Sequence, residues 1–229
     1  MERGLYIAAT GMVAEMVRQD QIANDLANAS TPGYKADRSS QSSFGDLLLS
    51  NTVSGQTIGP LGMGAQVDRI VTDVDPGPIR ETGEPLDFAI EGDGWFGVQT
   101  AQGVRYTRNG QFALSPQGTL IDSMGNQVVG QNGQPIRANG DGTVDPAQLG
   151  VFNLTGIAKV GDSYVTGTAA GQAQATVRSG ALEQPNVDAS RSMVDMIASF
   201  RSFEAGQRVI RTIDETLQKA TNQVGGLGH

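Results

Sequence analysis

Several carboxylates stand close together in the middle of the chain, and paired carboxylates are the usual equipment for cleaving glycosidic bonds. They are Glu81, Glu84, Asp87, Glu91 and Asp93. The surrounding pattern predicts that they precede or alternate with short strands, and no polar side chain suited to support them stands nearby. We therefore interpret them as solvated strand ends and turns, with a carbohydrate-active enzyme as the alternative.

Two glycine-rich segments resemble ligand-binding loops only in part. An EF-hand calcium loop beginning at Asn139 needs Gly at its sixth position and Glu at its twelfth, but the chain has Val144 and a glycine there. Segment 92–97 does not have the glycine spacing of a phosphate-binding loop, and no helix is predicted directly after it. Both segments predict tight turns, so Trp95 and Phe96 are expected to be core residues rather than a platform for stacking sugars.

The composition narrows the possible chemistry. The chain has 229 residues, no Cys, one His at its last position and a net charge of −8. The absence of Cys excludes thiolate chemistry. Nucleic-acid binding needs clustered Lys and Arg, and the sequence contains no such cluster. No apolar run approaches the roughly 20 residues of a membrane-spanning helix, and the N-terminus lacks the apolar stretch of a cleaved signal peptide. We expect no catalytic residue, cofactor, metal site, nucleic-acid partner or membrane insertion.

Residues 3–28 predict an amphipathic helix. Apolar side chains recur at the i, i+4, i+7 spacing that places them on one helical face. Segment 30–33 ends the helix, because Pro and Gly terminate and turn the chain. The apolar face is expected to form part of an assembly surface, through Leu5, Ala9, Met12, Met16, Ala23 and Leu26.

The middle of the chain has the pattern of a β domain. The sequence contains 31 Gly, which favours many tight turns, and turn signals separate short apolar runs between residues 76 and 180. Among them, Asn109-Gly110 predicts a two-residue hairpin. Turns every 8 to 12 residues or so are typical of an antiparallel sandwich or a partly open barrel. Residues 36–75 predict a linker with some strand character.

The C-terminal region predicts a longer helix, from Asp188 to Val224, which would extend about 55 Å. Its apolar residues repeat every seven positions, the periodicity of a coiled coil. A helix of this length cannot bury its whole stripe on a body of roughly a hundred residues, so we expect it to pair with the first helix and with neighbouring subunits. The expected assembly residues are Met196, Phe200, Phe203, Ile210, Leu217 and Val224.

A second row on this helix consists of Met193, Phe200 and Gln207. Gln207 interrupts its row, and Gln19 interrupts the row of the first helix. The two glutamines are candidates for a polar pair that sets the helix register, since a polar residue in a coiled-coil seam excludes other registers. The alternative is that both glutamines are solvated.

Together these regions predict an α+β chain, with long N- and C-terminal helices forming a coiled-coil stalk and a glycine-rich, antiparallel all-β middle domain. The expected boundaries are 1–35 for the N-terminal helix of an inner domain, 36–75 for the linker, 76–180 for the β-rich outer domain and 181–229 for the C-terminal helix of the inner domain. Stripes at both ends favour a subunit that assembles through them. A soluble binding module with a helical stalk is another alternative.

Four segments of the sequence, at residues 22–36, 82–96, 106–112 and 180–187, together resemble one known family, the flagellar rod and hook proteins. Residues 22–36 (IANDLANASTPGYKA) are similar to the family's N-terminal segment, in which a helix runs into a turn and an aromatic residue. Residues 82–96 (TGEPLDFAIEGDGWF) and 106–112 (YTRNGQF) resemble its middle blocks, and 180–187 (GALEQPNV) resembles the entry to its last helix. The matching helix-to-turn positions are Asn24, Asn28, Thr31, Gly33 and Tyr34.

This resemblance implies a structural axial subunit of the bacterial flagellar rod, without enzymatic activity, located in the basal body. The family's terminal helices pack into an inner tube with the β domain outside, and its members are exported by the flagellar type III apparatus without signal cleavage. The implied partners are other rod subunits, the hook subunit, the export apparatus and ring proteins. The middle blocks and segment 196–199 resemble the proximal rod subunit, which we favour. The opening helix and segment 44–48 resemble the distal rod subunit, which is the alternative.

A short segment, FGDLL, resembles the signal by which early rod and hook subunits engage the export gate. Its candidate residues are Phe44 and Leu48. The alternative interpretation is an ordinary strand or linker patch.

Overall fold

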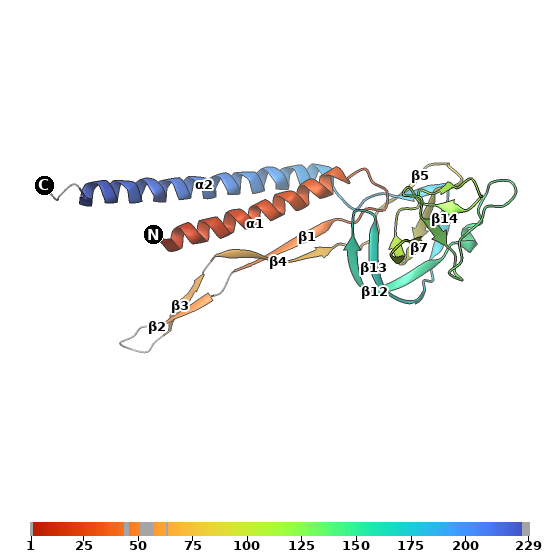
Figure 1. The fold of residues 1–229 in the computed structure, drawn as a ribbon, viewed down its shortest axis with the longest axis horizontal. Helices are drawn as coiled ribbons and strands as arrows, with labels where there is room; N and C mark the ends of the chain where they lie inside the picture. Colours follow the sequence, from red (N-terminus) through yellow and green to blue (C-terminus); the bar gives the residue numbers. More distant parts are fainter. Residues whose placement is uncertain (1, 44–45, 51–56, 63, 226–229) are drawn as a thin grey trace. The chain divides into compact units, whose positions relative to one another are not determined.

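The computed structural model describes residues 2–43, 46–50, 57–62 and 64–225, and the chain divides into two compact units. One unit contains residues 1–26, 37–71 and 189–229, and the other contains 27–36 and 72–188. The elements, labelled in part in Figure 1, are α1 (Glu2–Ala27), β1 (Asp37–Ser43), β2 (Asp46–Ser50), β3 (Thr57–Gly62), β4 (Ala65–Thr72), β5 (Ile79–Glu81), β6 (Phe88–Glu91), β7 (Trp95–Thr100), β8 (Gly103–Thr107), β9 (Ala113–Leu114), β10 (Leu120–Ile121), β11 (Gln127–Val129), the 3-10 helix η1 (Pro146–Gln148), β12 (Val151–Val160), β13 (Tyr164–Gln172), β14 (Thr176–Ser179), β15 (Ala181–Glu183) and α2 (Ala189–Gly225).

The first unit combines the two helices with a nested pair of hairpins. The two predicted helices are confirmed, and Figure 1 shows α1 running beside α2. β1 pairs with β4. The strands that lie between these two in the sequence, β2 and β3, pair antiparallel with each other. The segment expected to be a linker therefore contains four strands. Asp25 of α1 accepts a hydrogen bond from the backbone N–H of Asp37 at 3.2 Å, which fixes the start of β1 against the helix.

No helix among the described residues is both long enough and apolar enough to cross a membrane.

The second unit is built on an antiparallel ring of four strands. β7 pairs with β8, β8 with β13, and β13 with β12, while β12 returns to pair with the start of β7. The closing contact places Val151 opposite Phe96. The short strands β11, β10 and β9 extend the sheet from β7. The prediction of an antiparallel β middle domain is confirmed.

The core of this unit gathers apolar side chains from residues 88 to 151. Phe96 is fully buried and its ring meets that of Phe112 edge-on, with 5.4 Å between the centroids. Trp95, on the other face of β7, packs with Tyr106 and Val165. The prediction that Trp95 and Phe96 are core residues is confirmed. The main core consists of Phe88, Ile90, Phe96, Phe112, Leu120, Val128, Ile136, Val144, Leu149 and Val151.

The predicted hairpin at Asn109-Gly110 is wrong. A two-residue hairpin of this type needs a positive φ at its central residues, and Gly110 does not have one. β8 ends at Thr107, and the chain then passes against a distant segment, where the carbonyl of Gly110 accepts a hydrogen bond from the N–H of Phe88 at 3.0 Å. Glycine is required there because a side chain would overlap the carbonyl of Phe88.

A buried polar cluster closes the turn between β10 and β11 against β13. The hydroxyl of Tyr164 donates to the carboxylate of Asp122 and accepts from the side-chain amide of Asn126 at 2.9 Å. Burial, followed by the hydrogen bond to Asp122, raises the pKa of Tyr164 to about 12. The folded chain therefore holds the phenol proton more tightly than the unfolded chain, whose tyrosines titrate near ~10.

This shift predicts a loss of stability at high pH. The stabilisation is fully present below pH ~10 and declines as the pH rises toward the folded-state pKa, because the unfolded chain loses its proton first. Urea unfolding between pH 9 and 11.5 should show a shallower decline for Tyr164→Phe than for the unaltered chain. Tyr6→Phe, on α1 outside this cluster, is the control. Parallel declines for Tyr164→Phe and the unaltered chain would contradict the assignment.

Candidate assembly interface

The two helices pack antiparallel, with small residues of both helices at their contacts. A Cβ on Gly206 would lie 2.7 Å from Met12 Cγ, so the glycine permits a close approach of the helices. In the C-terminal half of α2, Ile213 would lie 3.4 Å from a Cβ placed on Gly4 of α1. Small residues at such positions let two helix backbones come near one another.

A buried hydrogen bond marks the same seam. Ser199 is 1% exposed, and its hydroxyl donates to the carboxylate of Glu15 and lies 3.3 Å from the backbone carbonyl of Glu15. Ser199 and Gly206 stand seven residues apart, and sequence reasoning missed both because it followed large apolar residues. Gln19 and Gln207 do not form the predicted pair within the described part of the chain, where the amide nitrogen of Gln19 has no hydrogen-bond partner and Gln207 is exposed.

The expected assembly residues of α2 fall into two groups. Met196, Phe203 and Ile210 are half-buried and alternate with the small residues of the seam. Phe200 is 53% exposed and Leu217 is 36% exposed. The backbone at 224 lies within α2, but the side chain of Val224 lies outside the described residues.

The first half of α2 carries an apolar surface that the described part of the chain leaves exposed. Met193, Val194, Ile197 and Phe200 are between 52% and 65% exposed. We call these four residues the outer stripe. Three of them follow the i, i+4, i+7 spacing of one helical face, a signal that could have placed Ile197 beside Phe200 from the sequence. Contiguous exposed apolar side chains of this kind mark interaction surfaces.

The expected assembly residues of α1 are likewise divided. Leu5 and Met16 are 39% and 51% exposed, and Ala23 is also exposed. Ala9, Met12 and Leu26 are half-buried. Exposed Ile7 and Val13 add to the apolar surface of this helix.

A groove of about 430 Å³ runs along the helix pair. Ile7, Ala8 and Gly11 of α1 line one side and Val209 of α2 lines another. Residues of the β1–β4 pair complete it, including Ala65. The lining of the groove is largely apolar.

The helix-to-turn residues end α1 and enter the second unit. Thr31 donates to Asn28 through both its backbone N–H, at 3.0 Å, and its hydroxyl, at 3.2 Å. Gly33 has a φ of 68°, and a Cβ there would overlap the backbone of Arg108. Tyr34 is fully buried, with the Lys159 ammonium 4.0 Å from its ring centroid.

Asn24, the remaining member of that group, lies exposed on α1. The other four surround a buried turn, so their chemistry serves the fold at that point.

Two of the carboxylates considered for glycosidic cleavage lie in ion pairs at the surface, and a third is buried. Glu81 and Glu91 are exposed and both form ion pairs with Arg178, the latter at 3.6 Å. Asp87 is buried, and its carbonyl and N–H belong to backbone hydrogen bonds. Exposed carboxylates shared by one arginine are typical of a solvated sheet surface.

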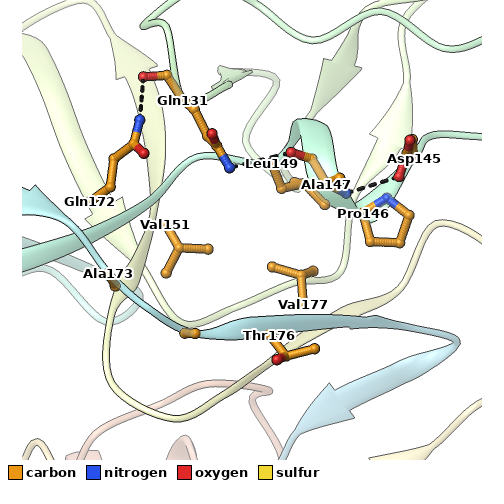
Figure 2. A pocket seen from close by; sticks show the side chains of 11 residues that line it. Gln131, Asp145, Pro146, Ala147, Leu149, Val151, Gln172, Ala173, Thr176 and Val177 are labelled. Carbon is orange, nitrogen blue, oxygen red and sulfur yellow. Dashed lines mark hydrogen bonds between the residues drawn. The ribbon is translucent and has the colours of Figure 1, made fainter.

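A pocket of about 420 Å³ lies on the β unit, beside η1 and β14 (Figure 2). Gln172 donates to the carbonyl of Gln131 at 3.3 Å, and Gln131 donates to that of Ala147 at 3.3 Å. Asp145, the one carboxylate among the described lining residues, accepts from the N–H of Ala147 at 3.0 Å and caps η1. Since glycosidic cleavage requires two carboxyl groups, this pocket does not supply them.

Within the described part of the chain, no three Asp, Glu or His side chains are grouped to hold a metal ion. Of the export-signal candidates, Phe44 lies outside the described residues. Leu48 is placed in β2 by its backbone, opposite Pro60 of β3, and its side chain is not among those described.

Sequence models of three families match the chain in succession. They are described as flagella basal body rod protein (residues 5–35), flagellar hook protein FlgE/F/G D1 domain (residues 89–152) and flagellar basal body rod FlgEFG protein C-terminal (residues 178–223). The flagellar basal-body rod protein FlgG of Bacillus subtilis (strain 168) is 31% identical over 97% of this chain and 99% of its own length. The flagellar basal-body rod protein FlgF of Escherichia coli (strain K12) is 33% identical over 96% of this chain and 97% of its own length.

Proposed function

Because the chain belongs to the flagellar basal-body rod protein family, we propose that it is a structural axial subunit of the rod that polymerises through its terminal helices and transmits torque across the envelope. Its location is the flagellar basal body. Support for the assembly route comes from one observation above the others: the outer stripe of α2 is apolar and uncovered in the isolated chain. Covering such a side chain contributes about 1.5–3 kcal/mol.

The inner part of the rod would be formed by residues 1–35 and 181–229, with the helices of neighbouring subunits packed as coiled coils, and 76–180 would form the outer domain. The segment expected as a linker, 36–75, would contribute its strands to the inner part, because residues 37–71 group with the two helices. The assembly surface would comprise the residues expected from the two helical stripes, with Val194 and Ile197 added. Binding partners would be other rod subunits, the hook subunit, the export apparatus and ring proteins. The chain would have no catalytic activity and no cofactor.

The position in the rod is a finer proposal. We favour the proximal rod subunit, because segments 92–95, 106–110 and 196–199 resemble that member of the family. The distal rod subunit is the second candidate, supported by the resemblance of the opening helix. Cross-linking of assembled basal bodies, followed by identification of the attached neighbours, separates the two. Cross-links to hook subunits would favour the distal position.

Deletion of the gene tests the proposed function. Cells without the chain should lose swimming and hook assembly, and purified basal bodies from complemented cells should contain the chain. In the same strain, Phe44→Ala tests the export signal and should retain the chain in the cytoplasm. The control is Leu61→Ala, in β3. Normal basal bodies after deletion would reject the function, while normal secretion of Phe44→Ala would reject only the signal.

A further inference from the structure

A single buried carboxylate gathers hydrogen bonds from three distant parts of the second unit. Glu183 is 1% exposed. Its Oε1 accepts from Lys35 Nζ at 2.6 Å and from the N–H of Gly77 at 2.9 Å. Its Oε2 accepts from Arg108 Nη1 at 3.0 Å. We call these four residues the Glu183 cluster.

Both cations of the cluster have further fixed contacts. Lys35 is 3% exposed, and its ammonium also donates to the carbonyl of Asp75 at 2.6 Å. Burial lowers the pKa of Lys35, and the Glu183 carboxylate acts in the opposite direction. Arg108 donates to the carbonyl of Gly92 at 2.9 Å and lies 5.5 Å from the ring centroid of Trp95.

A second layer of hydrogen bonds lies at the points where the chain passes between its two units. Three of the four passages lie at residues 36–37, 71–72 and 188–189, and we call the chain at these three the connecting segments. The side chain of Asn186 accepts from the N–H of Ala36 at 2.7 Å and donates to the carbonyl of Asp73 at 2.9 Å. The N–H of Asp73 donates to the carbonyl of Ala36 at 2.8 Å. The three connecting segments are thus joined directly to one another by hydrogen bonds.

The charges of the cluster are not explained by stability alone. Apolar residues of similar volume often stabilise a core as well as a buried ion pair does, whereas an ion pair demands one geometry. Each charged member also comes from a different one of the sequence blocks that resemble rod and hook proteins: 22–36, 106–112 and 180–187. The blocks therefore meet at one internal point.

We propose that the Glu183 cluster is a joint that fastens the three connecting segments to the β domain, so that they leave it as one rigid body. Glu183 acts as a positioning residue, since it is buried and its carboxylate holds the segments through hydrogen bonds. The joint itself is a property of the isolated chain. Its use in carrying load rests on the proposed function.

Hydrogen exchange on the purified full-length chain tests the joint. Glu183→Gln keeps the shape of the side chain but leaves two buried cations without a counter-charge. The amides of Ala36, Asp73 and Gly77 should then exchange roughly 100-fold faster, as expected when one partner of a buried pair is removed. The amide of Val98, in the core of the β unit, should change by no more than about 2-fold.

The matched control is Glu81→Gln, which removes an exposed carboxylate that pairs with Arg178. It should leave all these rates unchanged, because exposed ion pairs contribute little. Unchanged rates in Glu183→Gln would overturn the proposal. So would an equal acceleration at Val98, because Glu183 would then support the whole core rather than the joint.

If Glu183→Gln does not fold, Lys35→Met and Lys35→Arg take its place. Lys35→Met should accelerate the same three amides, and Lys35→Arg should restore part of their protection by keeping the cation. Equal rates in the two variants would overturn the proposal. In cells, Glu183→Gln should enter basal bodies but fail to support swimming at raised viscosity, and normal swimming there would overturn the load-carrying role. Absence of the unaltered chain from basal bodies would reject the proposed function and leave the exchange result standing.

Discussion

A chain carrying Ile197→Asp and Phe200→Asp is expected to fold normally and to fail to assemble. Both side chains are more than half exposed in the isolated chain, so a carboxylate there remains solvated. In an assembled rod the same carboxylates would be buried without a partner, which costs several times the lost apolar contact. Thermal unfolding by circular dichroism should match the unaltered chain, while basal bodies should lack the protein and cells should not swim.

Phe203→Asp is the informative comparison. Phe203 is half-buried and alternates with Ser199 and Gly206 along the seam that meets α1. Its replacement should therefore lower the helical melting temperature of the isolated chain, which Phe200→Asp alone should not do. Normal swimming of the double variant would show that the outer stripe is not an assembly surface.

The substitution Gly110→Ala is expected to destabilise the β unit strongly. Its Cβ would overlap the carbonyl oxygen of Phe88, a backbone atom that cannot rotate away. Phe88 is fully buried in the main core, and its N–H donates a hydrogen bond to the carbonyl of Gly110. Overpacking of this kind costs about 1–3 kcal/mol or more, which urea unfolding would show as a lower midpoint at an unchanged slope.

Gly140→Ala provides the control for this substitution. A Cβ at Gly140 meets nothing within 4 Å, and its φ is not positive. Its effect should stay within about 0.5 kcal/mol. Equal midpoints for the two variants would mean that the backbone near Phe88 relaxes without cost.

Local patterns in the sequence were sufficient where a residue's neighbours in the chain are also its neighbours in the fold. The heptad row through Met196 and Phe203 predicted α2, and the turn before Trp95 predicted a buried strand. The hairpin predicted at Asn109-Gly110 was wrong because a contact with Phe88, far away in the chain, overrides the local turn preference.

The parts that could not be predicted depend on long-range pairing. The return of β12 to β7 depends on where the whole sheet closes, which no local window contains. Glu183 lies 148 residues from Lys35 and 75 from Arg108. A signal for the cluster was nevertheless present, because each charged residue stood inside a separate resembling block.

Closure of the four-stranded ring also bears on solubility. β7, β8, β12 and β13 have strand partners on both sides along the residues that close the ring. Unpaired strand edges are templates for aggregation, and identical domains brought together in a polymer encounter one another at a high local concentration. In the proposed rod, a ring that uses these edges internally would keep neighbouring β units from pairing through them.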